Sequence, residues 1–185
     1  MTVNYRFERS KTCLLIIDVQ GKLFAQVERP CEVMHAIQKV VRGFQIMDLP
    51  IVVTEQYPEG LGSTVVGLKN LLGDKTEYFK KTTFSCVANP EIIEKLMPFD
   101  QFILVGIEAH VCVLQTAKDL LKSGKQVAVL NDATTSRSIY DFSTAIAEIR
   151  DVGGRISSVE TVLFELIQDS ASPEFKQISG LIKSS

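Results

Sequence analysis

The sequence predicts an α/β fold, a three-layer α/β/α sandwich with a central parallel sheet. Short apolar segments alternate with longer amphipathic segments along the 185 residues. This order of strand and helix is typical of a parallel sheet covered by helices on both faces. The apolar segments are continuous, as expected for strands that are buried on both sides. The length fits one domain over residues 1–185, and neither a repeat nor a low-complexity segment interrupts it.

The first half of the chain contains three predicted strands and one long helix. Residues 12–17, TCLLII, form a continuous apolar segment that predicts a buried strand. Apolar residues at helical spacing predict a helix over 30–48. The β-branched segment 51–54 predicts a second strand, 56–64 a glycine-containing loop, and 76–80 a short third strand.

The second half continues the alternation. Asn89, Pro90 and Glu91 mark a helix start, with a capping side chain, a proline at the first helical position and an acid in the first turn. The remaining predicted elements are strands at 101–107, 126–130 and 155–159, helices at 112–122 and 138–152, and one or two C-terminal helices, the second starting at Ser172. Right-handed crossovers between such parallel strands give a doubly wound sheet.

The composition argues against several classes of protein. The chain is 45% hydrophobic and 23% charged, and its 20 basic and 22 acidic residues give a net charge of −2. This balance argues against a nucleic-acid partner bound through a broad basic surface. Residues 1–11 contain no apolar segment typical of a signal peptide, and no stretch approaches the ~18 apolar residues of a membrane span. We therefore expect a soluble protein of the cytoplasm, without a membrane partner.

Cysteine and histidine are few and widely spaced. The residues of these two types are Cys13, Cys31, Cys86, Cys112, His35 and His110. Their spacing excludes a zinc ribbon, a C₂H₂ finger and an HExxH protease. A chain of this size forms its core without disulfides, so we expect four reduced thiols.

Ligands of doubly wound sheets bind beyond the carboxyl ends of the strands, which directs attention to the residues that follow each apolar segment. These residues are Asp18, Thr54, Glu55, Gln56, Lys80, Lys81, the segment 108–112 and Asp132. An acid, a lysine and a cysteine at one edge of a sheet have the chemistry of an activated nucleophile.

Cys112 is the candidate nucleophile. It lies at the start of a predicted helix, where the helix dipole and a nearby lysine favour a thiolate. The charge of Asp18 opposes a thiolate, so Asp18 fits this site as a proton acceptor whose charge the lysine offsets. Two alternatives remain open: Cys112 as a small buried hydrophobic residue, and Asp18 as a helix cap.

The neighbouring candidates are weaker. Lys80 and Lys81 point to opposite faces of a strand, so only one of them can face the site. His110 is two residues from Cys112, but the strand-to-helix turn separates their side chains, and we expect a structural or pocket-wall role for it. We expect structural roles for the other cysteines, Cys13, Cys31 and Cys86.

Three stretches together resemble the isochorismatase-like cysteine hydrolases. They are LLIIDVQ at 14–20, KTTFS at 81–85 and VGIEAHVCV at 105–113. The resemblance covers nearly the whole chain. It is closest to the isochorismatase domain-containing proteins, through TEQYPEGLGSTV at 54–65, DATTSRS at 132–138 and PEFKQISGLIK at 173–183.

The resemblance implies roles for named residues. Asp18 matches the general base of the family, Lys81 the lysine that stabilises the thiolate and the developing charge, and Cys112 the nucleophile. It also implies a non-proline cis peptide bond between Ile107 and Glu108. The backbone N–H groups of Glu108 and Cys112 would then form an oxyanion hole.

One departure from the family concerns metal binding. Family members that are nicotinamidases bind a metal through an Asp-x-His…His pattern after the second strand. This chain has Glu55, Gln56 and Tyr57 there, and no histidine lies between residues 36 and 109. We therefore predict no metal and no cofactor, and we do not expect nicotinamidase activity. The presence of Cys112 favours acyl transfer on a small amide-like substrate.

We also expect a substrate pocket and a homo-oligomer. The predicted pocket residues are Phe24, Gln56, Tyr57 and Phe84, with core packing or a solvated loop as the alternative for each. The resemblance implies assembly into a dimer or a larger form. A different class of function stays open at this point, in which the fold serves as a binding or assembly module and the triad is idle.

Overall fold

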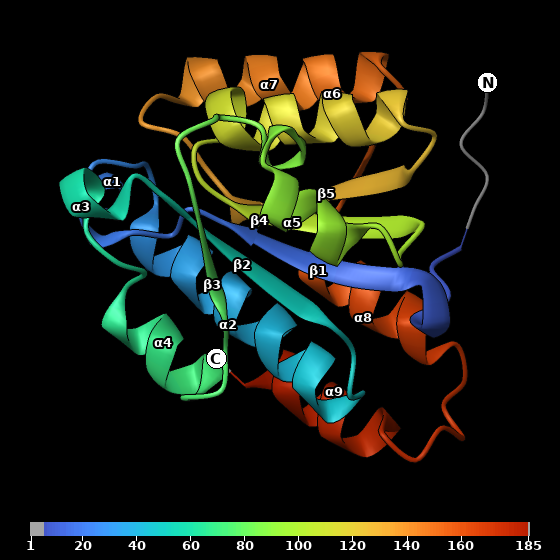
Figure 1. Ribbon diagram of the computed structural model, residues 1–185. Coiled ribbons are helices and arrows are strands. Elements are labelled where there is room, and N and C mark those ends of the chain that lie inside the picture. Colours follow the sequence, from blue (N-terminus) through green and yellow to red (C-terminus); the bar gives the residue numbers. More distant parts are fainter. Residues whose placement is uncertain (1–5, 185) are drawn as a thin grey trace.

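The computed structural model describes residues 6–184 and contains a six-stranded sheet in which every pair of neighbouring strands is parallel (Figure 1). The strand order is β3-β2-β1-β4-β5-β6. The strands are β1 (Thr12–Ile17), β2 (Ile51–Gln56), β3 (Tyr78–Lys81), β4 (Gln101–Gly106), β5 (Gln126–Thr134) and β6 (Arg155–Ser157). Residues 1–5 and 185, which include part of the N-terminal segment searched for a signal peptide and both limits of the predicted domain, lie outside the described residues.

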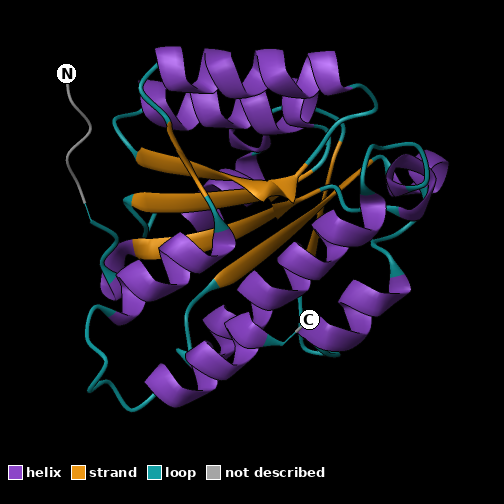
Figure 2. Ribbon diagram, turned by 180° about the vertical axis from the view of Figure 1, so that it is seen from behind, coloured by secondary structure: helices purple, strands orange, loops and turns teal. Residues whose placement is uncertain are grey.

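Helices cover both faces of this sheet (Figure 2). One face carries α2 (Pro30–Ile46), α4 (Val66–Leu72), α8 (Val159–Ile167) and α9 (Phe175–Lys183), and the other carries α5 (Pro90–Leu96), α6 (Leu114–Lys122) and α7 (Ile139–Asp151). Two single-turn helices, α1 (Gly21–Phe24) and α3 (Pro58–Leu61), lie beyond the carboxyl ends of the strands. The predicted three-layer α/β/α sandwich is confirmed. Within the part of the chain that is described, no helix is both long enough and apolar enough to cross a membrane.

The two faces of β1 show why the strands are apolar at every position. Leu14 and Ile16 pack into the core beneath α2 and α8, whereas Leu15 and Ile17 pack into the core beneath α5 and α6. All four side chains are fully buried. A strand between two helical layers has no solvent-facing side, so the usual alternation of apolar and polar residues is absent.

The structure differs from the sequence prediction at several element boundaries. The helices α1, α3 and α4 were not predicted, because each is only one or two turns long and lacks a clear apolar period. The strand β5 continues to Thr134 through polar residues that the apolar pattern excluded. The helix expected to start at Cys112 starts at Leu114, because a π-helical turn over Ala109–Val113 precedes it. The last helix begins at Phe175 rather than at Ser172.

The sheet order places a topological switch at β1. The chain leaves β1 to form β2 and β3 on one side, and then crosses to form β4, β5 and β6 on the other. At the carboxyl end of β1, Ile17 is in register with Thr54 of β2 and with Gly106 of β4. Such a switch opens a crevice between the strands that diverge from it, and ligands of doubly wound sheets bind there.

Gly106 permits the close approach of β1 and β4 at this crevice. Its φ angle is +118°, a region that residues with a side chain rarely adopt. A Cβ atom at this position would lie 2.1 Å from the backbone oxygen of Ile17. Only glycine therefore fits at this position.

Gly106→Ala should lower the free energy of unfolding by about 3 kcal/mol, since the new methyl group adds a clash with backbone to an unfavourable φ angle. The matched control is Gly124→Ala, where φ is +79° but no atom lies within 4 Å of the new Cβ. We expect a loss of about 1 kcal/mol there, from the backbone alone. Urea denaturation of both variants measures the difference. Equal losses would show that the contact with Ile17 carries no cost.

Candidate active site

Asp18 follows β1 and breaks the alternation of side chains along that strand. Ile17 faces the α5 and α6 layer, so a regular strand would direct the next side chain toward α2. The φ angle of Asp18 is instead +54°, in the left-handed region that Asp tolerates better than most residues. As a result its carboxylate reaches the side chain of Thr54, which is in register with Ile17 on the neighbouring strand.

The Asp18 carboxylate is paired with Lys81 in the interior of the protein. Lys81 Nζ lies 2.7 Å from Asp18 Oδ2, and both side chains are fully shielded from solvent. The other oxygen, Oδ1, accepts a hydrogen bond of 2.7 Å from the Thr54 hydroxyl. Charges are rarely buried unless they are paired and hydrogen-bonded, and each oxygen of Asp18 meets this condition.

Lys81 reaches Asp18 from β3, across the intervening strand β2. Its ammonium group also donates to Gln56 Oε1 at 2.7 Å and to the backbone oxygens of Thr83 and Phe84, both at 3.2 Å. Burial by itself lowers the pKa of Lys81, but the charge of Asp18 and the two neighbouring thiols outweigh this effect, and the pKa is raised. Lys81 therefore stays positively charged at neutral pH.

Two glutamines brace this part of the site. Gln20 donates from Nε2 to the backbone oxygen of Gln56 at 2.9 Å, and its Oε1 accepts from the Gln56 N–H at 2.7 Å. This pair of bonds joins the segment after β1 to the end of β2. Gln56 in turn donates to the backbone oxygen of Thr82 at 2.8 Å. Sequence reasoning missed Gln20, although its position two residues after Asp18 could have marked it.

Cys112 lies in the π-helical turn that follows β4. The carbonyl oxygen of Glu108 accepts hydrogen bonds from the N–H groups of Val111 at 3.1 Å and Val113 at 3.3 Å. The two donors to this carbonyl oxygen, Val111 and Val113, flank Cys112 in the sequence. The peptide bond between Ile107 and Glu108 is cis, as the resemblance implied. The Cys112 side chain is buried but not sealed, with 5% of its surface exposed.

The thiol of Cys112 interacts electrostatically with Asp18 and Lys81. Burial raises the pKa of Cys112, and the charge of Asp18 raises it further, while Lys81 lowers it. The resting state of Cys112 is therefore a neutral thiol.

Cys86 lies closer to the triad than the sequence suggested. Its sulfur is 3.9 Å from the Thr54 hydroxyl, which donates to Asp18. Burial, followed by the charge of Asp18, raises the pKa of Cys86 to about 11. Burial raises the pKa of Cys13 to about 12, and Cys31 is exposed on α2. Cys86 thus contacts, within the described part of the chain, a side chain that itself holds Asp18.

The two lysines at the end of β3 have the opposite orientations expected on a strand. Lys81 is buried with Asp18, whereas the Lys80 side chain is 65% exposed and pairs with exposed Glu59 at 3.2 Å. His110 does not contact the triad. Its ring nitrogen Nδ1 lies 3.0 Å from the Ser136 hydroxyl.

The predicted pocket residues have different environments. Phe24 is half-buried against the core beneath α2. Gln56 is buried, and its side-chain oxygen accepts a hydrogen bond from Lys81. Gln56 therefore supports Lys81 instead of offering that oxygen to a ligand. Tyr57 and Phe84 are each about half exposed, at 54% and 52%; Tyr57 comes directly after β2, and Phe84 lies three residues after β3. These two aromatic side chains are available to a ligand at the edge of the sheet.

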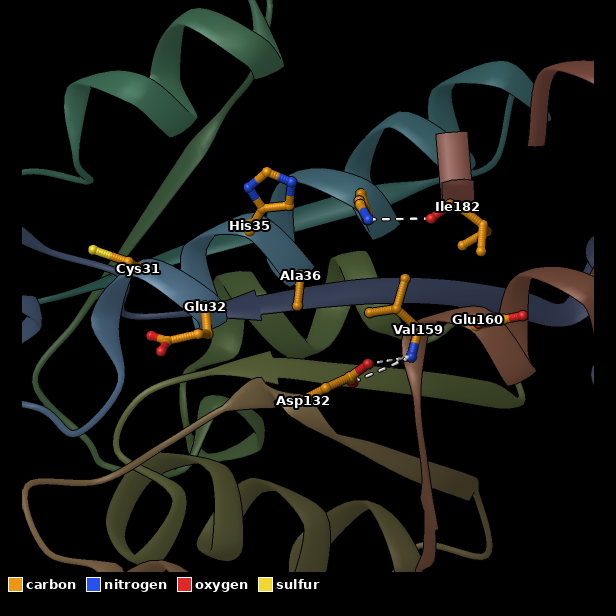
Figure 3. Close-up of a pocket in the computed structure, with 9 residues that line it drawn as sticks. Cys31, Glu32, His35, Ala36, Asp132, Val159, Glu160 and Ile182 are labelled. Carbon is orange, nitrogen blue, oxygen red and sulfur yellow. Dashed lines mark hydrogen bonds between the residues drawn. The ribbon is translucent and has the colours of Figure 1, made fainter. Parts of the chain in front are cut away.

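A surface groove of about 650 Å³ lies elsewhere, between the start of α2, the start of α8 and the end of α9 (Figure 3). None of the three triad residues lines it. Asp132, also a candidate from the strand-end rule, lies in this groove and accepts the backbone N–H of Val159 at 3.0 Å. Burial raises the pKa of Asp132 although this bond opposes the shift. Asp132 therefore caps α8 and is not part of the triad.

The position that carries a metal ligand in nicotinamidases is engaged differently here. Glu55 accepts hydrogen bonds from the Thr64 N–H at 2.7 Å and from the Thr64 hydroxyl at 2.8 Å. Lys69 lies 3.9 Å from the same carboxylate. Over residues 6–184, no group of three or more His, Cys, Asp or Glu side chains is arranged to hold a metal ion. The residues present at this position do not fit a metal.

Comparison with known proteins places a family domain over most of the chain. Residues 12–161 match the model of the isochorismatase domain. The chain belongs to the isochorismatase family. It is 40% identical over 176 residues to a secreted isochorismatase effector of Phytophthora sojae, covering 92% of this chain and 83% of the relative. Isochorismatase domain-containing protein 1 of Danio rerio is 37% identical over 169 residues, covering 90% of this chain and 59% of that protein.

Among solved structures, the MAR1 ribonuclease of Caenorhabditis elegans superposes with a TM-score of 0.93 at 37% identity, covering 98% of this chain and 94% of the other. Family membership confirms the resemblance found in the sequence and supports a hydrolase of unspecified substrate. The chain spans less than two thirds of the Danio rerio protein, so the activity of that whole protein does not transfer to it directly.

Lys81→Met should destabilise the protein by about 3–5 kcal/mol, because it leaves the Asp18 charge buried without a partner. The double variant Asp18→Asn with Lys81→Met removes both charges and should lose less stability than the sum of the two single variants. Urea denaturation of all four proteins gives the coupling energy. The matched control is the exposed pair between Lys80 on β3 and Glu59 on α3, for which we expect less than about 1 kcal/mol. Additive losses at Asp18 and Lys81 would contradict the buried ion pair.

Proposed function

We propose that this chain is a metal-free cysteine hydrolase that acts on a small amide-like substrate through Asp18, Lys81 and Cys112. One observation carries the proposal: the Cys112 thiol lies where it feels the charge of a carboxylate that is itself paired with a buried lysine. A nucleophile within reach of a base, with the base oriented by a third group, is the arrangement that nucleophilic catalysis requires. The proposal includes a single domain over 1–185.

The first half-reaction forms a thioester. Asp18 takes the proton of the Cys112 thiol as the sulfur attacks the carbonyl carbon of the substrate. The carbonyl oxygen becomes an oxyanion, for which the N–H groups of Glu108 and Cys112 are the proposed donors. Asp18 then gives its proton to the leaving amine as the C–N bond breaks. The products are the free amine and a thioester on Cys112.

The second half-reaction uses water. Asp18 takes a proton from a water molecule as the water oxygen attacks the thioester carbon. The C–S bond then breaks, the carboxylic acid product leaves, and the proton on Asp18 returns to the sulfur of Cys112. The enzyme ends in its initial state, with a neutral thiol and an ionised carboxylate.

Lys81 supports both half-reactions electrostatically. Its ammonium group is 2.7 Å from Asp18, and it stays charged because its pKa is raised. A fixed positive charge beside the carboxylate offsets its negative charge in the interior. It also stabilises negative charge as it develops on sulfur and oxygen. Gln56 and the backbone oxygens around it hold Lys81 in this position.

Two other functions are outcomes of the same test. A solved relative is described as a ribonuclease, and hydrolysis of RNA would require contacts to several backbone phosphates. The net charge of −2 gives no support to such contacts, and absence of a nucleic-acid partner stays a prediction. The other function is a binding or assembly module with an idle triad. The homo-oligomer and the cytoplasmic location also stay predictions.

Hydrolysis of small amides and esters should fall by at least about 10³-fold in Cys112→Ala, since the nucleophile is removed. The assay is release of amine or alcohol from a panel of uncharged and charged acyl compounds, with single-stranded and double-stranded RNA as separate arms. Intact mass spectrometry of rapidly quenched reactions should show the acyl group on Cys112. Cys31→Ala is the control, because Cys31 is exposed on α2 and away from the triad.

The contrary outcomes are distinct. Cleavage of RNA with retained activity in Cys112→Ala would favour a nuclease that does not use this thiol. Absence of turnover on every compound, with no acyl adduct in the wild type, would favour the binding or assembly module. Equal loss in Cys31→Ala and Cys112→Ala would show that the loss reflects thiol removal in general and not the triad.

A further inference from the structure

The segment that follows β5 contacts the start of the turn over Ala109–Val113, which holds Cys112 and is called the nucleophile turn below. The N–H of Ala109 donates to the backbone oxygen of Thr135 at 2.9 Å. Thr135 donates from its hydroxyl to the backbone oxygen of Glu28 at 2.9 Å, and the N–H of Glu28 donates to the backbone oxygen of Ser136 at 2.9 Å. Residues 135–136 thus connect the turn after β4 to the segment after α1. Because β1 and β4 border the crevice, this segment forms part of its rim.

Arg137 is the next residue along this rim. Its Nε atom lies 2.7 Å from Oε2 of Glu108, the residue that precedes the turn over Ala109–Val113. The Glu108 side chain is 10% exposed, whereas that of Arg137 is 56% exposed. The partly buried carboxylate therefore holds one side of the guanidinium and leaves the rest of the group at the surface.

The two terminal nitrogens of Arg137 have no hydrogen-bond partner among residues 6–184. They present donor N–H groups in the planar, parallel arrangement that matches a carboxylate. Glu108 uses the Nε side of the guanidinium, so it orients the group without occupying these donors. A cation fixed in direction by one acid and open on its other edge has the geometry of an anion-binding group.

Charge around the triad gives Arg137 a specific part in recognition. Asp18 and Lys81 neutralise each other within the interior. Two exposed side chains near this edge, Tyr57 and Phe84, are aromatic, and the exposed Lys80 nearby is paired with Glu59. Arg137 has free donors for an anionic group on a ligand, while the planar part of the ligand could lie against the aromatic side chains.

We propose that Arg137 binds a carboxylate of the substrate, so that the substrates are small acids carrying an amide or related acyl group. This inference rests on the proposed function, because it places the acyl group at Cys112. Glu108 connects the two subsites: its backbone N–H is a proposed oxyanion donor, and its side chain orients Arg137. The carboxylate and the reacting carbonyl belong to one compact molecule.

The test compares alkylating reagents that differ only in charge. Iodoacetate and 3-iodopropionate carry a carboxylate, and iodoacetamide and 3-iodopropionamide are their neutral counterparts. The rate of modification of Cys112 is measured by peptide mass spectrometry at pH 7 with each reagent. Exposed Cys31 in the same protein reports the intrinsic reactivity of each reagent, and the ratio of the two rates isolates the effect of the site.

In the wild type we expect the ratio of the Cys112 rate to the Cys31 rate to be higher for the anionic reagent than for its neutral counterpart. This difference should appear with at least one of the two reagent lengths. Arg137→Gln should reduce this preference by about tenfold, since a charge-assisted hydrogen bond is lost. Arg137→Lys, which keeps the charge without the paired donors, should retain part of it. Arg42→Gln, at an exposed arginine on α2, should leave the preference unchanged. Thermal denaturation checks that each variant is folded.

The outcomes separate this inference from the proposed function. Rapid labelling of Cys112 by the neutral reagents with no charge preference, or a preference unaffected in Arg137→Gln, would overturn the role of Arg137 and leave the cysteine hydrolase in place. Labelling of Cys112 no faster than that of buried Cys13 with any reagent would count against the reactive thiol itself. Monoamides of dicarboxylic acids hydrolysed in preference to the diamides, with the preference lost in Arg137→Gln, would support both.

Discussion

The buried ion pair between Lys81 and Asp18 is the interaction on which the site depends. It joins the ends of β1 and β3 across the strand between them, and β2 supplies Thr54 to one partner and Gln56 to the other. A buried charge without a partner costs several kcal/mol, so these strands must end in register for the protein to fold. The requirement that places the charges together also places the base beside the nucleophile.

In the proposed mechanism, this pair determines how the thiol is activated. Burial and the charge of Asp18 raise the pKa of Cys112, so the cysteine rests as a neutral thiol rather than as a thiolate. Its proposed reactivity depends on proton transfer to the Asp18 carboxylate, which is paired with Lys81. Such a site is reactive only when a substrate is positioned for attack, since the thiol and the base must act together. The exposed Cys31 has no comparable partner and serves as a natural reference.

Much of this arrangement could be predicted from the sequence. The continuous apolar segments predicted the sandwich, and the rule that ligands bind beyond strand ends gave a set of polar residues that included Asp18, Lys81 and Cys112. Strand alternation showed that only one of Lys80 and Lys81 could face the site, and the family resemblance selected Lys81. The supporting role of Gln56 could not be predicted, because it depends on the register between β2 and β3, which no local pattern specifies. The short helices were missed for a related reason: packing, not periodicity, stabilises a single helical turn.

The sequence by itself determined the layers, the strands and the residue types at their carboxyl ends, because apolar burial and helix capping act over short stretches of chain. Only the tertiary structure decided which of those residues meet. The left-handed backbone of Asp18 turns its carboxylate toward the Lys81 face, against the alternation of β1. The turn over Ala109–Val113 brings Cys112 to that carboxylate. Both depend on contacts between strands far apart in sequence. The free energy of such contacts depends on three-dimensional geometry, which a local sequence pattern does not specify.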